Sequence, residues 1–286
     1  MSETNYSEND IRSMVSQVLA SLVGNGGVDV ASSGAGVVVD EAEFAPTLAV
    51  PNPANRGAYE QMMAATPARI GEWRAGPQPT VKSLLRFRAD HAGAMDAVFN
   101  DVDEKLPEQL GLFCVQSAAA DKGSYLMDPN LGARFTDETA KKIGEHCVHG
   151  AQVQIIVSDG LSLIAVESNL PDLLPALTQG LQRCGLSAGT DLFVKYGRVR
   201  IMDEVTAILG CDVTLILLGE RPGLVTNESL SCYMTYRGHP GAPESIRTVV
   251  SNIYDEGTPP AEAGAYLADI AKKMIDSKVS GLELKL

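Results

Sequence analysis

The chain has 286 residues, and its 36 acidic side chains outnumber 23 basic ones, so the net charge is −13 at neutral pH. This balance argues against a nucleic-acid-binding protein, which needs a basic surface to meet the phosphate backbone. No stretch approaches the roughly 18 uninterrupted apolar residues that a membrane span needs, and five scattered cysteines without a CxxC spacing favour reduced thiols in the cytoplasm.

The N-terminal segment, residues 1–44, differs from the rest of the chain in charge and composition. Glu3 and Glu8 stand where a secretory signal would carry lysines, so no export is predicted. Residues 9–22 carry a narrow apolar stripe at helical spacing, which predicts an amphipathic helix. The residues up to 44, rich in small side chains and then acidic, predict a flexible linker. Since a short helix on a linker cannot bury its stripe alone, it packs either on its own domain or on a partner.

Residues 45–150 are predicted to form a smaller, mostly helical region. Thr80 can cap a helix that runs to about Phe99, and the spacing places three apolar residues on its inward face, Val81, Leu84 and Leu85. Arg86 and Asp90 lie four residues apart on this helix, a surface pair worth only about 0.3–0.5 kcal/mol. The same stretch is locally basic within an acidic protein, through Arg69, Arg74, Lys82, Arg86 and Arg88.

The pattern of apolar residues changes in residues 151–286, where it predicts strands that alternate with helices. Apolar runs at 153–157, 191–199 and 213–218 predict strands buried on both faces, and such strands belong to parallel sheets with right-handed crossovers. Two further strands are expected at 231–237 and 247–254. The predicted fold is therefore α/β, with a Rossmann-like, mainly parallel sheet flanked by helices. The mostly helical region and the N-terminal amphipathic helix precede it.

Three helices are predicted within this α/β region. The first has Pro171 as a first-turn residue, and the second covers residues 201–209. The last begins at Thr258-Pro259, a cap followed by a first-turn proline, and runs to about Ser277. Its inward face would consist of Ala263, Leu267, Ile270 and Met274.

The ends of the predicted parallel strands carry polar residues beside glycines. The three stretches are Ser158-Asp159-Gly160, Tyr196-Gly197-Arg198-Val199 and Gly219-Glu220-Arg221-Pro222-Gly223. In an open α/β sheet, ligands bind beyond the carboxyl ends of the strands. Glycines there let backbone amides approach a ligand, and four charged side chains supply polar anchors, namely Asp159, Arg198, Glu220 and Arg221. The pattern indicates a binding site without naming its ligand.

Catalytic motifs are missing from the sequence. No GxGxxG opens a helix after a strand, and GxxxxGK[ST], GxSxG and HExxH are absent. His146 and His149 form an HxxH without an acid or cysteine partner in register, so no metal site is predicted. Cys232 lies next to the candidate site, but a small buried thiol is its expected role, and His91 is expected to cap a helix or pack in a core. No catalytic residue is therefore assigned to this chain.

Five stretches, in order over about residues 70–265, resemble the small (light) subunit of ethanolamine ammonia-lyase. They read RAGPQPTVKSLLRFRADHA, QIIVSDGLS, FVKYGRVRI, LLGERPGLVTNESLSCYMTY and SNIYDEGTPPAEA. The combination of SDGLS with GERPGL and ESLSCY is too long for chance similarity. The amphipathic pattern at 9–22 fits the same family.

The resemblance implies a heteromeric lyase of large and small subunits that converts ethanolamine to acetaldehyde and ammonia with adenosylcobalamin. Substrate and radical chemistry would belong to the barrel-shaped large subunit, and the small subunit would help hold cobalamin at the interface between the two. That division fits a chain without catalytic residues. The alternatives are a structural subunit that stabilises its partner without contacting ligand, and a stand-alone α/β enzyme that uses Asp159, Glu220 or Cys232.

Three cobalamin contacts follow from the family resemblance. They are Val199, the valine of YGRV, Glu220, the acid of GERPG, and Val249, in RTVVSN, where the family pattern carries a cysteine. The departure at Val249 matters only if the contact needs sulfur rather than backbone. No DxHxxG motif is present, so we expect cobalamin to keep its own dimethylbenzimidazole on cobalt.

The N-terminal helix at 9–22 also resembles the short targeting peptides of bacterial microcompartment enzymes. Such peptides dock on shell or scaffold proteins. The resemblance therefore implies a cytoplasmic protein held in the lumen of a microcompartment, with the shell or scaffold as a second partner beside the large subunit.

Overall fold

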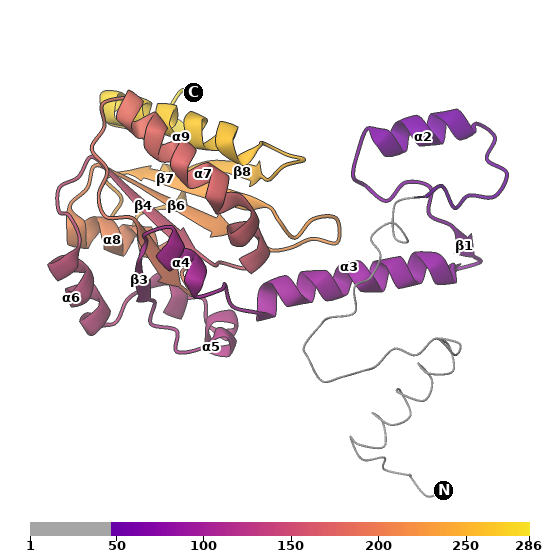
Figure 1. Cartoon of the computed structure of the whole chain (residues 1–286), viewed down its shortest axis with the longest axis horizontal. Coiled ribbons are helices and arrows are strands. Elements are labelled where there is room, and N and C mark those ends of the chain that lie inside the picture. The colour runs from indigo at the N-terminus through magenta and orange to yellow at the C-terminus, as the bar shows by residue number, and fades with distance from the viewer. Residues whose placement is uncertain (1–46) are drawn as a thin grey trace, which may run out of the picture. The chain divides into compact units, whose positions relative to one another are not determined.

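A six-stranded sheet forms the centre of residues 47–286, the part of the chain that the computed structural model describes (Figure 1). The predicted helix at 9–22 and the predicted linker lie outside the described residues. The strand order is β3-β5-β4-β6-β7-β8. The first four strands are parallel, and β7 and β8 are antiparallel. Their bounds are β3 Phe113–Gln116, β4 Val153–Ser158, β5 Leu192–Lys195, β6 Val213–Gly219, β7 Leu230–Tyr236 and β8 Thr248–Ile253.

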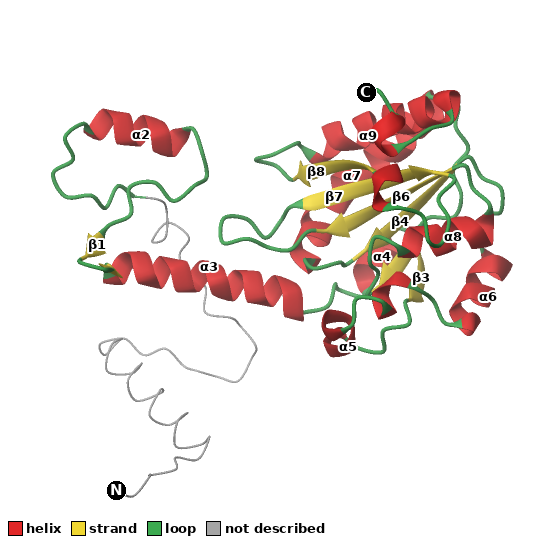
Figure 2. Ribbon diagram, turned by 180° about the vertical axis from the view of Figure 1, so that it is seen from behind, coloured by secondary structure: helices red, strands yellow, loops and turns green. Residues whose placement is uncertain are grey.

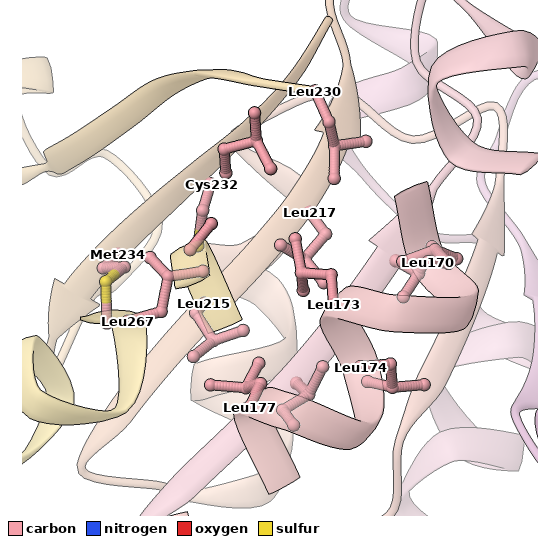
Figure 3. Close-up of a cluster of buried hydrophobic side chains, with 14 of the residues drawn as sticks. Leu170, Leu173, Leu174, Leu177, Leu215, Leu217, Leu230, Cys232, Met234 and Leu267 are labelled. Carbon is pink, nitrogen blue, oxygen red and sulfur yellow. The ribbon is translucent and has the colours of Figure 1, made fainter. Parts of the chain in front are cut away.

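Helices cover both faces of this sheet (Figure 2). On one face lie α7 (Leu163–Arg183) and α9 (Pro260–Ser277), which share a core with the sheet. On the other lie α6 (Asp137–His146) and α8 (Ile201–Leu209). Side chains of a strand alternate between faces, so β6 sends Leu215 and Leu217 into the first core and Ile216 into the second. Figure 3 shows the first core, where the leucines of α7 meet β6, β7 and α9. The prediction of a mainly parallel α/β sheet flanked by helices is confirmed.

The predicted strands at 153–157 and 213–218 are confirmed as β4 and β6, and the predicted helix at 201–209 as α8. The prediction of a strand to residue 199 is wrong, because β5 ends at Lys195. There Tyr196 takes a φ of 60°, a left-handed conformation that strand geometry does not allow. Strand β3 was not predicted, and it lies in the stretch that the sequence predicts as mostly helical.

Two helix boundaries also differ from the prediction. Pro171 lies inside α7, which begins at Leu163 behind Ser162, whose hydroxyl accepts a hydrogen bond from Ala165 N at 3.1 Å. Pro171 is exposed, and α7 continues through it although a proline inside a helix removes one backbone hydrogen bond. Helix α9 begins at Pro260, one residue later than expected, and its predicted inward face is fully buried as Ala263, Leu267, Ile270 and Met274.

The segment of residues 56–99, called the α2–α3 segment below, contains α2 (Arg56–Ala64), a short hairpin of β1 (Arg74–Ala75) and β2 (Gln78–Pro79), and α3 (Val81–Phe99). The bounds of α3 match the prediction, but its orientation does not. Val81 is 74% exposed and Leu85 55% exposed, so the predicted inward face points largely to solvent. Only Ser83 and Ala97 of this helix are buried.

Short elements complete the described chain. Between α3 and β4 lie α4 (Lys105–Gln109), α5 (Lys122–Met127) and the 3-10 turn η2 (Leu131–Ala133). Two further 3-10 turns follow: η3 (Glu244–Ile246) precedes β8, and η4 (Gly281–Glu283) follows α9. None of the helices in residues 47–286 has the length and apolar character to cross a membrane.

Candidate functional site

A hollow of about 440 Å³ opens at the carboxyl ends of β4 and β6. This is a switch point of the sheet, because the chain leaves β4 through α7 on one face and leaves β5 through α8 on the other. Ligands of open α/β sheets bind at such points. The lining residues come from α5, from strands β6, β7 and β8, and from the turns after β4, β5 and β6, namely Tyr125, Gly160, Leu161, Arg198, Val199, Leu218, Gly219, Glu220, Arg221, Ser231, Tyr233 and Ser251.

Glu220 stands at the rim of this hollow with one carboxylate oxygen held in place. Its backbone N donates to Ser229 O at 3.0 Å, which continues the pairing of β6 with β7. The Ser231 hydroxyl donates to Glu220 Oε1, and Asn252 N reaches the same oxygen at 3.4 Å. No hydrogen bond from residues 47–286 reaches Oε2. The carboxylate is therefore oriented by the protein and keeps one oxygen as an acceptor for a ligand.

Ser231 is itself part of a short chain of hydroxyl groups. Its oxygen lies 2.9 Å from that of Ser251 on β8. Both contacts have Ser231 as the donor, and because a hydroxyl has one proton, the charged carboxylate is the stronger of its two acceptors. Ser231 is 1% exposed, and a buried hydroxyl bonded on both sides has little freedom to turn.

Val199 lines the same hollow from the turn that follows β5. Backbone hydrogen bonds fix this turn: Arg198 N donates to Gly132 O at 2.7 Å, and Gly197 N to the Ser158 hydroxyl at 2.9 Å. A Cβ on Gly197 would lie 2.8 Å from Ser158 Oγ, so this approach requires glycine. The turn therefore presents Val199 rigidly.

The three residues expected to contact cofactor are only partly gathered in one place. Val199 and Glu220 both line the hollow, but Val249 does not. Val249 is 44% exposed on β8 and pairs with Tyr233, which is a lining residue. It thus lies beside the hollow, on a sheet face that continues from it.

The other polar anchors that the sequence suggests have different surroundings. Arg221 is exposed at the rim. The Arg198 guanidinium lies 4.1 Å from the centre of the Tyr125 ring and donates to Tyr125 O at 3.2 Å, while its buried Nε has no hydrogen-bond partner within residues 47–286. This stacking is a cation–π contact, and it closes the side of the hollow that α5 forms.

Asp159 serves the fold rather than the hollow. Its carboxylate is 1% exposed and accepts hydrogen bonds from Tyr196 N at 2.7 Å, the Ser158 hydroxyl at 3.1 Å and Lys122 Nζ at 3.3 Å. Burial raises the pKa of this carboxyl, and Lys122 and the hydrogen bonds work against that rise. The network ties the end of β4 to the turn after β5 and so sets the distance between two walls of the hollow.

Sequence reasoning missed Ser231, Tyr233 and Ser251. The signal was present in the alternation of β7, where polar residues at 231 and 233 point one way and core residues point the other. Period-two alternation of this kind marks the two faces of a strand. It indicates that β7 has a polar side, but which ligand or neighbour that side meets depends on contacts with β6 and β8.

The remaining candidate groups do not join the site. His146 Nδ1 lies 2.9 Å from Lys142 O, and His149 Nε2 lies 2.7 Å from Gly144 O, so each ring bonds to a backbone carbonyl. Cys232 is fully buried in the core with its pKa raised by burial, as expected of a structural thiol. The lining residues offer acceptors, donors and apolar surface, and no nucleophile paired with a base.

Comparison with known proteins gives one consistent result. Residues 56–285 match the family model described as ethanolamine ammonia-lyase light chain. The chain is 47% identical over 294 residues to the ethanolamine ammonia-lyase small subunit of Clostridium tetani, covering 98% of this chain and 100% of that one. It is 49% identical over 235 residues to the small subunit of Fusobacterium nucleatum, covering 82% and 80%. With that of Listeria monocytogenes the identity is 46% over 247 residues, covering 86% and 84%.

Proposed function

The chain belongs to the ethanolamine ammonia-lyase light-chain family, and we propose that it helps bind adenosylcobalamin at its interface with the large subunit. In this proposal the complex deaminates ethanolamine to acetaldehyde and ammonia, and the catalytic residues lie on the large subunit. When bound, adenosylcobalamin supplies the radical that starts the reaction. The sheet then acts as Rossmann-like sheets do, with the ligand beyond the carboxyl ends of its strands.

The oriented carboxylate of Glu220 is the observation that carries this proposal. Cobalamin is rimmed by acetamide and propionamide groups, whose N–H donors need acceptors. Glu220 offers Oε2 while Ser231 and Asn252 hold Oε1. A hydrogen bond from an amide to this charged group is worth about 1.5–3 kcal/mol. A carboxylate acceptor favours a ligand whose edge carries N–H donors over a ligand whose edge carries only carbonyl oxygens.

The other groups around the hollow fit the remaining chemistry of the ligand. Amide carbonyl and phosphate oxygens need donors, and Arg221 stands exposed at the rim. Val199 and Val249 add apolar surface for methyl and methylene groups of the corrin periphery. Because both valines can also act through their backbone, the absence of a cysteine at Val249 is compatible with a contact there.

The size of the hollow favours a shared site. Its volume of about 440 Å³ lies in the lower part of the roughly 300–1,000 Å³ found for pockets that enclose a drug-sized ligand. Cobalamin is larger than such ligands. The hollow would therefore receive one edge of the cofactor, and the large subunit would cover the rest.

The lower face of the cofactor is expected to keep its own base. No histidine is among the residues that line the hollow. We therefore propose that cobalamin binds with dimethylbenzimidazole on cobalt. An EPR spectrum of the cob(II)alamin form bound to the complex should show coupling to the nitrogen of that base, and coupling to a protein histidine would overturn this part of the proposal.

Replacement of Glu220 by alanine tests the binding role. In the complex of both subunits, Glu220→Ala should weaken cobalamin binding about tenfold, which corresponds to about 1.4 kcal/mol, without changing assembly. Glu262→Ala, on the exposed side of α9, is the matched control. Unchanged affinity with intact assembly would favour a structural subunit that stabilises its partner without contacting ligand.

We also propose that residues 9–22 direct the chain to a microcompartment, where a shell or scaffold protein binds them. The apolar stripe at helical spacing supports this role. Deletion of residues 1–22 should leave activity intact and abolish encapsulation. Lost activity would instead indicate that these residues pack on their own domain.

A further inference from the structure

Helix α3 presents a continuous apolar stripe to solvent. Val81 is 74%, Leu85 55%, Met95 44% and Phe99 57% exposed, and Ala92 is exposed between them. Steps of four, seven, three and four residues keep all five on one side of a helix. We call these residues, Val81, Leu85, Ala92, Met95 and Phe99, the α3 stripe.

The surroundings of the stripe concentrate exposed apolar surface. Of the fourteen large apolar side chains that are exposed in residues 47–286, seven lie between Met62 and Phe99. Meanwhile α2 has no buried residue and α3 has two. Scattered apolar residues on a surface are ordinary, but a contiguous stripe marks an interaction site. A helix with so little of its own surface buried draws its stability from packing on something else.

The stripe lies within the part of the chain that the family model covers. The model matches residues 56–285, which include α2 and α3. A surface that belongs to the shared family region should meet a partner that the whole family shares. For a chain of this family that partner is the large subunit.

Charge argues against a second copy of the same chain. Arg88 lies on the stripe between Leu85 and Ala92 and is exposed. If two copies paired by a two-fold axis through the middle of the stripe, their Arg88 side chains would lie within about one helical turn of each other, and like charges so placed repel. The α2–α3 segment holds six basic and four acidic residues, whereas residues 100–286 hold 16 and 25. A basic, apolar surface on an acidic chain fits a partner with an apolar groove and an acidic side chain.

Helix α3 is tied to the loop beside the hollow through the side opposite the stripe, which leaves the stripe itself uncovered by this loop. Arg69 donates to Leu224 O at 3.2 Å and pairs with Asp90 of α3, which also accepts from Arg86 at 3.2 Å. Leu224 belongs to the loop that leaves the hollow at Glu220, and the neighbouring Val225 is 52% exposed.

We propose that the α3 stripe is a docking surface for the large subunit of ethanolamine ammonia-lyase. It inserts apolar side chains into a groove of that subunit, and Arg88 meets an acidic residue there. The inference uses the family membership but not the cofactor contacts. Assembly measured without cobalamin therefore tests it separately from the proposed function.

The test is a double substitution, Leu85→Glu with Met95→Glu, in the full chain co-expressed with the large subunit. Without cobalamin, sedimentation velocity should show at least tenfold weaker association than for the unmodified pair. Leu282→Glu is the control, because Leu282 is 88% exposed away from the stripe. Circular dichroism should show unchanged helix content, since both replaced side chains are largely in solvent. Unweakened association would overturn the proposal.

Oxidation of methionine by dilute hydrogen peroxide provides a second readout on the unmodified protein. Met95, 44% exposed, and Met127, 86% exposed, should both react in the free full-length chain. In the complex Met95 should be protected relative to the free chain. Equal oxidation of Met95 in both states would overturn the proposal. Protection in the free chain would also overturn it, because its own N-terminal segment or a second copy would then cover the stripe.

Discussion

Ser231 donates its only proton to the carboxylate of Glu220, and this bond joins a core strand of the sheet to the rim of the hollow. The two residues are eleven positions apart and meet because β6 and β7 pair antiparallel, with Leu218 opposite Ser231. Removing the hydroxyl frees Glu220 to rotate and leaves the carboxylate without its buried partner.

We expect Ser231→Ala to weaken cobalamin binding by the complex about threefold to tenfold, less than Glu220→Ala. The lost binding free energy corresponds to one hydrogen bond, about 0.5–1.5 kcal/mol. The Ser231 hydroxyl only orients the Glu220 carboxylate, which is the group that accepts from the ligand. Equilibrium titration of the complex with cobalamin measures the change. A chain that carries both Ser231→Ala and Glu220→Ala should bind cobalamin as weakly as Glu220→Ala alone, because Ser231 acts through Glu220. Additive losses would show that Ser231 acts independently of Glu220.

Gly219, the first residue of GERPG, should not tolerate a side chain. A Cβ there would lie 2.2 Å from Ser162 O and 2.7 Å from Asp159 O, and neither backbone atom can move without displacing the end of β4. We expect Gly219→Ala to lower the free energy of unfolding by about 1–3 kcal/mol or more. Chemical denaturation measures it. Gly57→Ala, where the nearest atom would be 3.7 Å away, should be neutral or stabilising in its helix.

Replacing only one partner of the buried ion pair between Lys122 and Asp159 should lower the stability of the fold. Their side chains are 11% and 2% exposed. We expect Lys122→Met to destabilise the chain by about 3–5 kcal/mol, because it leaves a buried carboxylate uncompensated. Thermal and chemical unfolding measure the loss. Adding Asp159→Asn to the same chain should recover part of it, and no recovery would mean that the loss comes from packing rather than charge.

Asp191, just before β5, should make stability depend on pH. Burial raises the pKa of its carboxyl from 3.8 to about 6. The folded state therefore binds the proton more tightly than the unfolded state, and this group's stabilising contribution falls as pH rises from about 4 to about 6. Asp191→Asn should flatten that fall and raise the melting temperature at pH 7 by about 2–4 °C. A melting temperature at pH 7 equal to that of the unmodified chain would contradict this assignment.

The sequence predicted the elements whose signal is local. Runs of apolar residues located β4 and β6, and helical spacing located α8 and the buried face of α9, because these segments meet only their own core. Strand β3 was missed because it has four residues and lies at the sheet edge with Cys114 exposed. The orientation of α3 was mispredicted for a different reason. Periodicity finds an apolar stripe on a helix, but it does not say whether the stripe meets the same chain or another molecule.

The residues of the candidate site also differ in whether a local sequence pattern could reveal them. Glu220 was singled out because strand ends of a parallel sheet gather at one edge, whereas Val199 was named through the family resemblance, and both residues line one hollow. The hydrogen bonds of Ser231, Ser251 and Asn252 join strands through contacts 11 to 32 positions apart. Such contacts depend on register, which no local pattern fixes. The commitment of Asp159 to Lys122, 37 positions away, was hidden for the same reason.

A cryo-EM map of the large and small subunits with bound cobalamin tests the central claim most directly. We expect one edge of the corrin ring to enter the hollow, with an amide nitrogen of the cofactor within hydrogen-bonding distance of a Glu220 carboxylate oxygen. A map in which cobalamin lies elsewhere and side chains of the large subunit fill the hollow would contradict it.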